Sequence, residues 1–264
     1  MEFKDIIFEK KGHVATITLN HPEKYNALSF NCYKELMQAF EDIEKDREVK
    51  VVVIKARGKA FCAGADLSDL GTLAGGQKES PLTEQAKPSG RGPYEVIENC
   101  TKPVIAAVQG MALAGGLELL LVCDIVIASE EARLGDQHAN FGLVPGGGAT
   151  QRLPRLIGIR KAKELLFTGD WISPQEAERI GLVNKVVPAD KLDEAVEELC
   201  RKLVNKSYEA ASAVKRLVYE GMQTDLETGL GLERKAVAAH FSSETFKEGV
   251  KSFLEKRKPD FSKL

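Results

Sequence analysis

Short apolar runs recur along the first two thirds of the chain, and their pattern predicts strands. Val14–Leu19 alternates polar and apolar positions, whereas Val51–Ile54 is a continuous β-branched run. Val104–Val108, Cys123–Ala128 and Val183–Val187 are further apolar runs of similar length. Short runs rich in β-branched residues favour strands over helices.

Helical spacing is found between these runs and dominates the last third of the chain. In Ser29–Lys45, Leu36, Phe40 and Ile43 fall on one helix face and acidic residues on the other. Alternation of strands with such segments predicts an α/β core. Ser173 is a good N-cap with Pro174 at the first helical position, and Gly181 is a good stop. The later predicted helices are Ser173–Gly181, Leu192–Val204, Ala210–Glu220, Leu226–Phe241 and Glu244–Lys256.

Residues 71–92 interrupt this regular pattern with glycines, prolines and mixed polar residues. A loop of this length inside a compact domain is typical of a disordered segment or a functional lid. The sequence therefore predicts a loop there, either disordered or a lid.

The composition narrows the class of protein. A chain of 264 residues fits one large domain, alone or with a small appendage, and a net charge of −2 gives no electrostatic case for nucleic-acid binding. The longest apolar run, Met111–Ala128, contains Glu118 and Asp124, which argues against a membrane span. Five widely spaced cysteines without a CxxC pair indicate free thiols, so we expect a cytoplasmic protein.

Several common catalytic motifs are missing from the sequence. The four histidines never approach metal-ligand spacing, and there is no HExxH, so we expect no metal. Gly146–Gly148 lacks the GxGxxG spacing, no glycine-rich loop ends in GK[ST], and no GxSxG turn is present. The sequence therefore gives no signal for a nucleotide-phosphate loop or a serine triad.

The segment GMALAGGLE, residues 110–118, is the strongest candidate for chemistry. Gly115 and Gly116 follow an apolar run, and Glu118 lies about one turn later in an otherwise apolar stretch. Glycines at a helix start leave N–H groups free for a ligand, and the carboxylate falls on the same face. This arrangement suits a developing oxyanion next to an acid/base group. A tight turn into a buried helix, with Glu118 capping or paired, explains the same residues.

Two further segments accompany it. In FCAGAD, residues 61–66, Gly64 allows a sharp turn that presents the Ala65 N–H, and Asp66 can cap the next helical turn. The stretch LGDQHANFGLVPGGGATQRL, residues 134–153, is a glycine-punctuated loop that ends in a predicted helix.

With these three segments in this order, the chain resembles the crotonase, or enoyl-CoA hydratase/isomerase, family. The stretches HPEKYNAL, TKPVIAAVQG, LFTGDWISPQEAERIGLVNKVV and FLEKRKPDF extend the resemblance over nearly the whole chain. It implies an α/β spiral of ββα units over residues 1–195 and a C-terminal helical trimerisation region over residues 196–264. It also implies a homotrimer or a dimer of trimers, and an acyl-coenzyme A that is the substrate rather than a cofactor.

The resemblance assigns roles to individual residues. The thioester oxygen would accept hydrogen bonds from the N–H groups of Ala65 and Gly115, and Glu118 would be the first acid/base residue. Where hydratases of the family have a second glutamate, this chain has His138. Coenzyme A would contact Lys24, Tyr25, Ala27, Ala63, Ala65, Asp66, Leu67, Gly115 and, from a neighbouring subunit, Lys256.

These assignments predict a lyase that reversibly hydrates a 2-enoyl-CoA, with Glu118 as the main acid/base and His138 as its partner. Hydrolysis of an acyl-CoA, isomerisation of its double bond, or acyl-CoA binding without catalysis are the alternatives. His138 could also be a packed or solvent-facing residue. A buried thiol is the simpler explanation of Cys62 than a nucleophile, and backbone capping the simpler explanation of Asp124 and Asp136.

Overall fold

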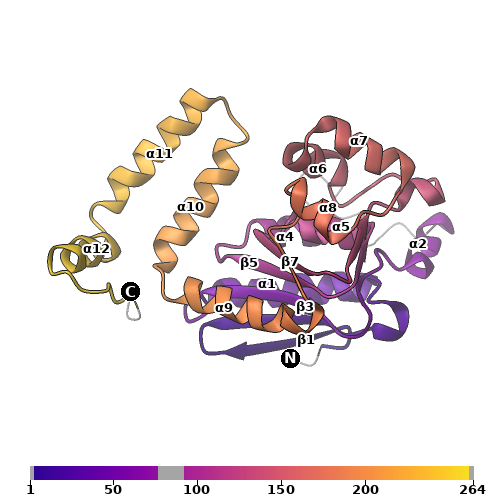
Figure 1. Ribbon diagram of the computed structural model, residues 1–264, viewed down its shortest axis with the longest axis horizontal. Coiled ribbons are helices and arrows are strands. Elements are labelled where there is room, and N and C mark those ends of the chain that lie inside the picture. Colours follow the sequence, from indigo (N-terminus) through magenta and orange to yellow (C-terminus); the bar gives the residue numbers. More distant parts are fainter. Residues whose placement is uncertain (1–2, 77–91, 262–264) are drawn as a thin grey trace.

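The computed structural model describes residues 3–76 and 92–261, and two sheets form its body (Figure 1). The larger sheet has the order β1-β2-β3-β5-β7-β9, and the smaller one has the order β4-β6-β8. β1 pairs with β2 in antiparallel fashion, while the other neighbours are parallel. The strands are β1 (Ile6–Lys11), β2 (Val14–Leu19), β3 (Val51–Ala56), β4 (Ala60–Cys62), β5 (Val104–Val108), β6 (Met111–Leu113), β7 (Ile125–Ser129), β8 (Arg133–Gly135) and β9 (Lys185–Val187).

Helices fill the spaces between the strands and form the C-terminal part of the chain. The α-helices are α1 (Phe30–Lys45), α2 (Leu67–Ala74), α4 (Pro93–Glu98), α5 (Gly115–Leu121), α6 (Ala149–Ile157), α7 (Ile159–Thr168), α8 (Pro174–Arg179), α9 (Leu192–Val204), α10 (Tyr208–Gly221), α11 (Leu226–His240) and α12 (Glu244–Leu254). Short 3₁₀ turns are η1 (Pro22–Lys24), η2 (His138–Phe141) and η3 (Ala189–Lys191).

From β3 to β9, consecutive strands alternate between the large and the small sheet, which produces the predicted spiral. The pairs β3–β4, β5–β6 and β7–β8 each place their first strand in the large sheet and their second in the small one. Each pair is followed by helical structure. The prediction of an α/β spiral of ββα units is therefore confirmed.

Burial on both faces explains the continuous apolar run of β3. Val52 and Ile54 belong to the cluster that contains the apolar face of α1. Val51 and Val53 face the other way and pack with residues of α9. A strand covered on both sides has no polar face, so its sequence does not alternate.

The predicted elements differ in how well they match. Val14–Leu19 and Val104–Val108 coincide with β2 and β5, and the long helices match within a few residues. β1 was missed, as were β4, β6 and β8, which have three residues each and leave little periodicity to detect. The prediction of a loop over residues 71–92 is wrong at its start, where Gly71 lies in α2. Residues 77–91, and with them the expected lid, lie outside the described residues.

The C-terminal helices α10, α11 and α12 extend away from the sheets (Figure 1). α9 still packs on β3, β5 and β7, so it belongs with the body. The division into residues 1–195 and 196–264 stays a prediction, and residue 196 lies inside α9. All five cysteines are free thiols, and none of the described helices is long and apolar enough to cross a membrane.

Gly116 allows α5 to lie directly against β4, and its replacement should be destabilising. A Cβ at Gly116 would lie 2.2 Å from the Cys62 carbonyl oxygen. We expect Gly116→Ala to lower the free energy of unfolding by about 3 kcal/mol, because overpacking forces the helix outward. Urea unfolding measures this change. Gly71→Ala in α2 is the control, since a Cβ there has no atom within 4 Å; equal losses in both variants would contradict the expectation.

Candidate active site

The end of β6 and the start of α5 form a strained turn that leaves a backbone donor free. Ala114 has φ 48° and ψ −116°, an unusual conformation for a residue with a side chain. It caps α5, whose first residue, Gly115, has no intrahelical partner for its N–H. The N–H group of Gly115, at the start of α5, is therefore free to donate a hydrogen bond.

A second turn brings another free N–H to the same place. Gly64 follows β4 with φ +105°, as predicted for a sharp turn. A Cβ at Gly64 would lie 3.2 Å from the Gly115 nitrogen, and a Cβ at Gly115 would lie 3.2 Å from the Ala65 nitrogen. Within the described residues, neither the Ala65 nor the Gly115 N–H donates a hydrogen bond. Two unpaired donors, the N–H groups of Ala65 and Gly115, thus lie close together.

The segment 25–28 holds the Gly64–Asp66 turn in place through backbone hydrogen bonds. The Ala63 N–H donates to the Tyr25 carbonyl at 3.0 Å, and the Leu28 N–H donates to the Gly64 carbonyl at 2.7 Å. The Asp66 N–H donates to the Leu28 carbonyl, so Leu28 binds the residues on both sides of Ala65 and leaves the Ala65 N–H unbound. Asn26 anchors this segment through its amide, which donates to two backbone carbonyls at 2.8 Å.

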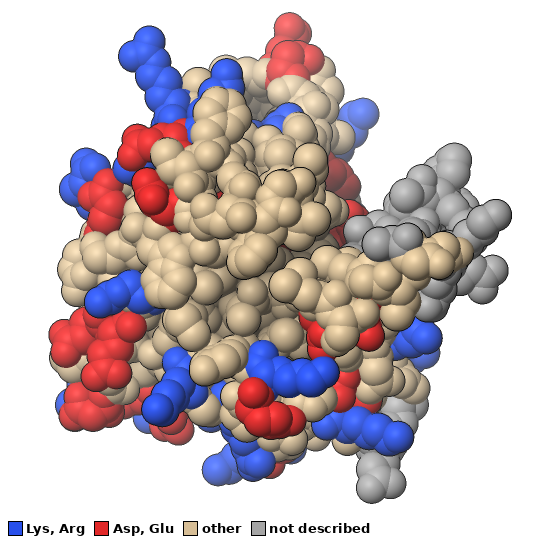
Figure 2. All heavy atoms as spheres, turned by 90° about the vertical axis from the view of Figure 1, so that its right-hand side faces the viewer, with Lys and Arg blue, Asp and Glu red and all other residues tan. Residues whose placement is uncertain are grey.

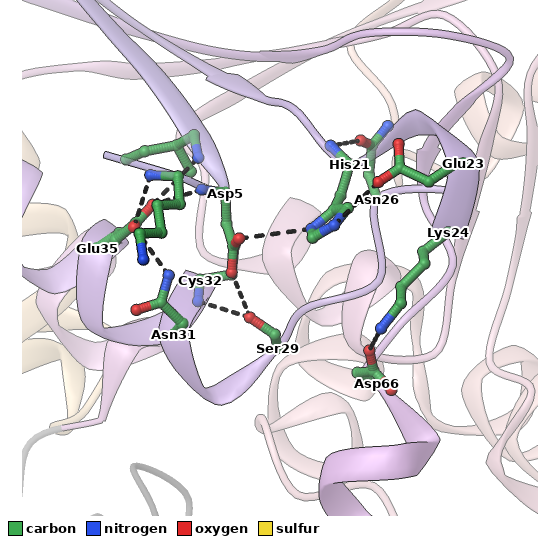
Figure 3. A network of polar contacts seen from close by, with 12 residues as sticks. Asp5, His21, Glu23, Lys24, Asn26, Ser29, Asn31, Cys32, Glu35 and Asp66 are labelled. Atoms are coloured by element: carbon green, nitrogen blue, oxygen red, sulfur yellow. Dashed lines mark hydrogen bonds and ion pairs between the residues drawn. The ribbon is translucent and has the colours of Figure 1, made fainter. Parts of the chain in front are cut away.

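Lys24 and Asp66 form an ion pair at the rim of this turn. The Lys24 Nζ lies 2.8 Å from Asp66 Oδ2, and the lysine side chain is 53% exposed (Figure 3). Asp66 caps α2 by accepting the Ser68 N–H, which confirms the predicted cap. The Lys24 ammonium and the Ser68 donors hold the pKa of Asp66 at about 2. An exposed cation is therefore fixed beside the Ala65 donor.

Glu118 is buried in the first turn of α5, with one oxygen bound and one free. Its Oε1 accepts the Gly147 N–H at 2.7 Å and the Ala149 N–H at 3.1 Å. Within the described residues, the hydrogen bonds to this carboxylate all go to Oε1, and Oε2 accepts none. Burial raises the pKa of Glu118, while the two N–H donors and His138 oppose that rise. The carboxyl group is therefore both held and available for proton transfer.

His138 follows β8 and is oriented by a buried carboxylate. Its Nδ1 lies 3.0 Å from both oxygens of Asp136, which is fully buried. Burial alone would lower the pKa of His138, but the hydrogen bond and charge of Asp136 and the charge of Glu118 outweigh it and raise the pKa. Since Nδ1 is committed to Asp136, Nε2 is the nitrogen left to bind a ligand. Sequence reasoning assigned Asp136 to the backbone, and it does accept the His138 N–H.

Tyr94 contacts both the Gly115 turn and the loop that binds Glu118, and it was missed by sequence reasoning. Its buried hydroxyl donates to the Gly115 carbonyl at 3.2 Å, and Tyr33 lies 3.2 Å away on its other side. Its ring contacts the loop that binds Glu118, because a Cβ at Gly147 would lie 2.4 Å from Tyr94 Cε2. Burial raises the pKa of the Tyr94 hydroxyl well above its usual range. No spacing in the sequence marks a tyrosine in so short a helix as a site residue.

The structure gives the remaining candidates other roles, although Cys62 lies beside the Gly64 turn, where its Sγ accepts the Gly64 N–H at 3.4 Å. Cys62 is a buried thiol whose burial raises its pKa to about 12, which makes it a poor nucleophile. Asp124 accepts the Val104 N–H and pairs with Lys215 at 2.7 Å. Lys256 follows α12, at the other end of the molecule from α2 (Figure 1). Among the described residues, no group of His, Cys, Asp and Glu could hold a metal ion.

The surface near α2 and α7 is poor in charge. Figure 2 shows a broad area without Lys, Arg, Asp or Glu on this side of the molecule, hollowed near its middle. Leu67, Phe141 and Leu143 are exposed apolar side chains on the segments next to the site. Exposed apolar area of this kind marks binding surfaces.

The pKa of His138 should depend on Asp136. In Asp136→Asn the carboxylate charge is lost while burial still lowers the pKa, so the pKa of His138 should fall below its wild-type value. An NMR titration of the imidazole protons, assigned with His138→Gln, measures it. Asp193→Asn removes an exposed carboxylate elsewhere and should leave His138 unchanged. A wild-type pKa in Asp136→Asn would refute the assigned cause.

Comparison with known proteins identifies relatives over the whole chain. The family model described as Enoyl-CoA hydratase/isomerase matches residues 9–263. A short-chain-enoyl-CoA hydratase of Clostridium acetobutylicum is 42% identical, covering 98% of this chain and 97% of the relative. A crotonyl-CoA hydratase of Syntrophomonas wolfei is 38% identical, covering 99% of both chains.

Solved structures agree with these relatives. The crystal structure of an enoyl-CoA hydratase from Bacillus anthracis superposes with a TM-score of 0.89 at 38% identity, covering 98% of this chain and 99% of that one. With a matching sequence family, a matching fold and paired free N–H groups beside a buried carboxylate, the chain belongs to the enoyl-CoA hydratase/isomerase family.

Proposed function

We propose that this protein catalyses the reversible hydration of a 2-enoyl-CoA to a 3-hydroxyacyl-CoA. The observation that carries the proposal is the half-bound carboxylate of Glu118 close to the two free N–H groups of Ala65 and Gly115. Relatives named for short-chain enoyl-CoA and crotonyl-CoA support a short acyl chain as substrate.

The two free N–H groups would bind the thioester oxygen. Adding water to the β-carbon moves an electron pair toward that oxygen and forms an enolate. Donors fixed before the reaction stabilise this charge, and one of them begins a helix. Loss of one such donor typically costs about 3–4 kcal/mol of transition-state stabilisation.

Glu118 would move the protons. Its free Oε2 accepts a proton from water as the water oxygen bonds to the β-carbon. The protonated carboxyl group then returns a proton to the α-carbon, and the thioester carbonyl re-forms. Burial raises the pKa of Glu118, which brings it closer to the range in which a carboxyl group serves as both base and acid.

His138 would hold the attacking water. In the neutral ring, Nδ1–H donates to Asp136, so Nε2 can accept a hydrogen bond from water. His138 would thus do the work of the second glutamate that other hydratases of the family have at this position. Because the pKa of His138 is raised, the neutral form is populated at higher pH than for an ordinary histidine.

Coenzyme A would bind along the rim formed by segments 24–27 and 63–67. Lys24 offers an exposed ammonium to a phosphate, and Tyr25 and Leu67 are exposed on either side of the Ala63–Asp66 turn. Backbone contacts at Ala27 and Ala63 complete the proposed subsite. Lys256 would reach coenzyme A from a neighbouring subunit, since it lies far from the site of its own chain.

The C-terminal helices would form a trimer or a dimer of trimers. Neither α10 nor α11 buries a single residue in the isolated chain, although both carry apolar stripes. Phe253, next to the end of α12, is 82% exposed. Helices with uncovered apolar faces are stabilised by packing against another surface. We place the assembly in the cytoplasm, in keeping with the five free thiols.

The acid/base assignment can be tested with crotonyl-CoA. We expect Glu118→Gln to lower kcat about 10²- to 10⁴-fold, because the amide cannot accept the proton. His138→Ala should lower kcat by a smaller factor. Hydration is followed by loss of enoyl absorbance, with products identified by mass.

Glu131→Gln is the control, since Glu131 is exposed and outside the site. Unchanged rates in Glu118→Gln would reject the assignment. Hydrolysis, isomerisation or binding without turnover by the wild-type protein would identify one of the competing activities instead.

The assembly can be tested by light scattering. We expect a mass three or six times that of the 28.9 kDa chain. Phe253→Arg should dissociate the assembly if this side chain is covered by a partner, whereas Lys258→Glu in the exposed tail should not. A monomeric wild-type protein would rule out the proposed trimer.

A further inference from the structure

Arg152, in the first turn of α6, connects the loop that binds Glu118 to helix α4. Its Nη1 donates to the Gly147 carbonyl at 2.9 Å. Its Nε and Nη2 donate to the two oxygens of Glu98 at 2.7 and 2.5 Å. Both side chains are about four fifths buried. A two-pronged bond of this kind fixes the orientation of the guanidinium as well as its position.

The carbonyl that Arg152 binds lies between the two donors of Glu118. The Gly147 N–H precedes this peptide group and the Ala149 N–H follows it, and both donate to Glu118 Oε1. Gly148 has φ +107°, and a Cβ there would lie 1.8 Å from Arg152 Nη1. The guanidinium therefore occupies the space beside a backbone that glycine alone can form without strain. Because this short segment carries both donors, a displacement of its backbone moves the two N–H groups together.

Helix α4 supports the same loop from its other end. Tyr94 in its first turn packs against Gly147, and Glu98 in its last turn holds Arg152. One short helix thus contacts the Glu118 loop directly and through the guanidinium. The Tyr94 ring and the Arg152 guanidinium therefore both fix the position of the Gly147 backbone.

We propose that Arg152 is a positioning residue for the catalytic carboxylate. Through the Gly147–Gly148 peptide group it orders the two N–H donors of Glu118, so that Oε1 stays bound and Oε2 faces the substrate. This role rests on the proposed function of Glu118. It goes beyond stabilising the fold, because it sets the geometry and proton affinity of one carboxyl group.

The role predicts a change in protonation as well as in rate. N–H donors favour the charged carboxylate and lower its pKa, so disordering them should raise the pKa of Glu118 further. The other titratable groups that face Glu118 are His138, Asp136, Tyr94 and Tyr33, and these remain in place. The acidic limb of the pH–rate profile should therefore move to higher pH.

The first test needs no substrate. Hydrogen–deuterium exchange should be faster at the Gly147 and Ala149 amides in Arg152→Lys than in wild type, because a single ammonium cannot bind Gly147 and both oxygens of Glu98. Glu98→Gln, which keeps the shape of the partner but removes its charge, should show a smaller increase. Arg155→Lys is the matched control on the same helix, since Gln151 is the one hydrogen-bond partner of Arg155 among the described residues.

The second test uses hydration of crotonyl-CoA. We expect Arg152→Lys to lower kcat about a hundredfold, as small misplacements of catalytic groups do, with a much smaller change in KM. Its acidic limb should move to higher pH, and Arg155→Lys should match wild type. Wild-type exchange at Gly147 and Ala149 in both Arg152→Lys and Glu98→Gln would overturn the proposal.

A lower melting temperature with an unmoved pH profile would also overturn it, because that result indicates a structural ion pair. If the wild-type protein does not hydrate enoyl-CoA, the proposed function fails. The exchange test then still decides whether Arg152 orders the two donors.

Discussion

The site depends on the close approach of two backbone turns with no side chain between them. Gly64 and Gly115 meet so closely that a Cβ on either would touch the other turn. Gly116 in turn lets α5 rest against the Cys62 carbonyl. The N–H groups of Ala65 and Gly115 can converge because glycine occupies each of these positions. Larger residues would separate the turns and leave two isolated donors instead of a pair.

The small sheet determines which segments come together. Its parallel strands β4, β6 and β8 end at Cys62, Leu113 and Gly135, and the segments that follow carry the candidate chemistry. Parallel strands place their carboxyl ends along one edge, where loops can meet. Ala65, Gly115, Glu118 and His138 therefore gather at one edge although they span more than seventy positions of the chain.

The electrostatics of the site favour a cooperating pair of unlike groups. Burial raises the pKa of Glu118, and Asp136 with Glu118 raises the pKa of His138 above what burial would allow. Each group stabilises the charged form of the other, so their titrations are linked. Asp136 commits one imidazole nitrogen and leaves the other for a ligand. A histidine held this way can take the place of a carboxylate in binding water. Its ring proton then lies on Nδ1, toward Asp136, and Nε2 is left to accept a hydrogen bond from the water.

The sequence by itself determined the local elements and the candidate donors. The alternation in Val14–Leu19, the apolar run at Val104–Val108 and the caps at Asp66 and Ser173 all act within a few residues, so their signals are readable along the chain. The glycines at 64 and 115 were readable for the same reason, since a turn that needs glycine is a local demand.

The tertiary structure alone decided which distant groups meet. Gly147 and Ala149 bind Glu118, Arg152 joins that loop to Glu98, and Tyr94 spans the two halves of the site. These contacts join residues about twenty to more than fifty positions apart, and no periodicity relates them. The same holds for the short strands β4, β6 and β8, whose existence depends on pairing with one another. Packing between distant segments determines these features. A local sequence pattern does not show which distant residue a side chain will contact.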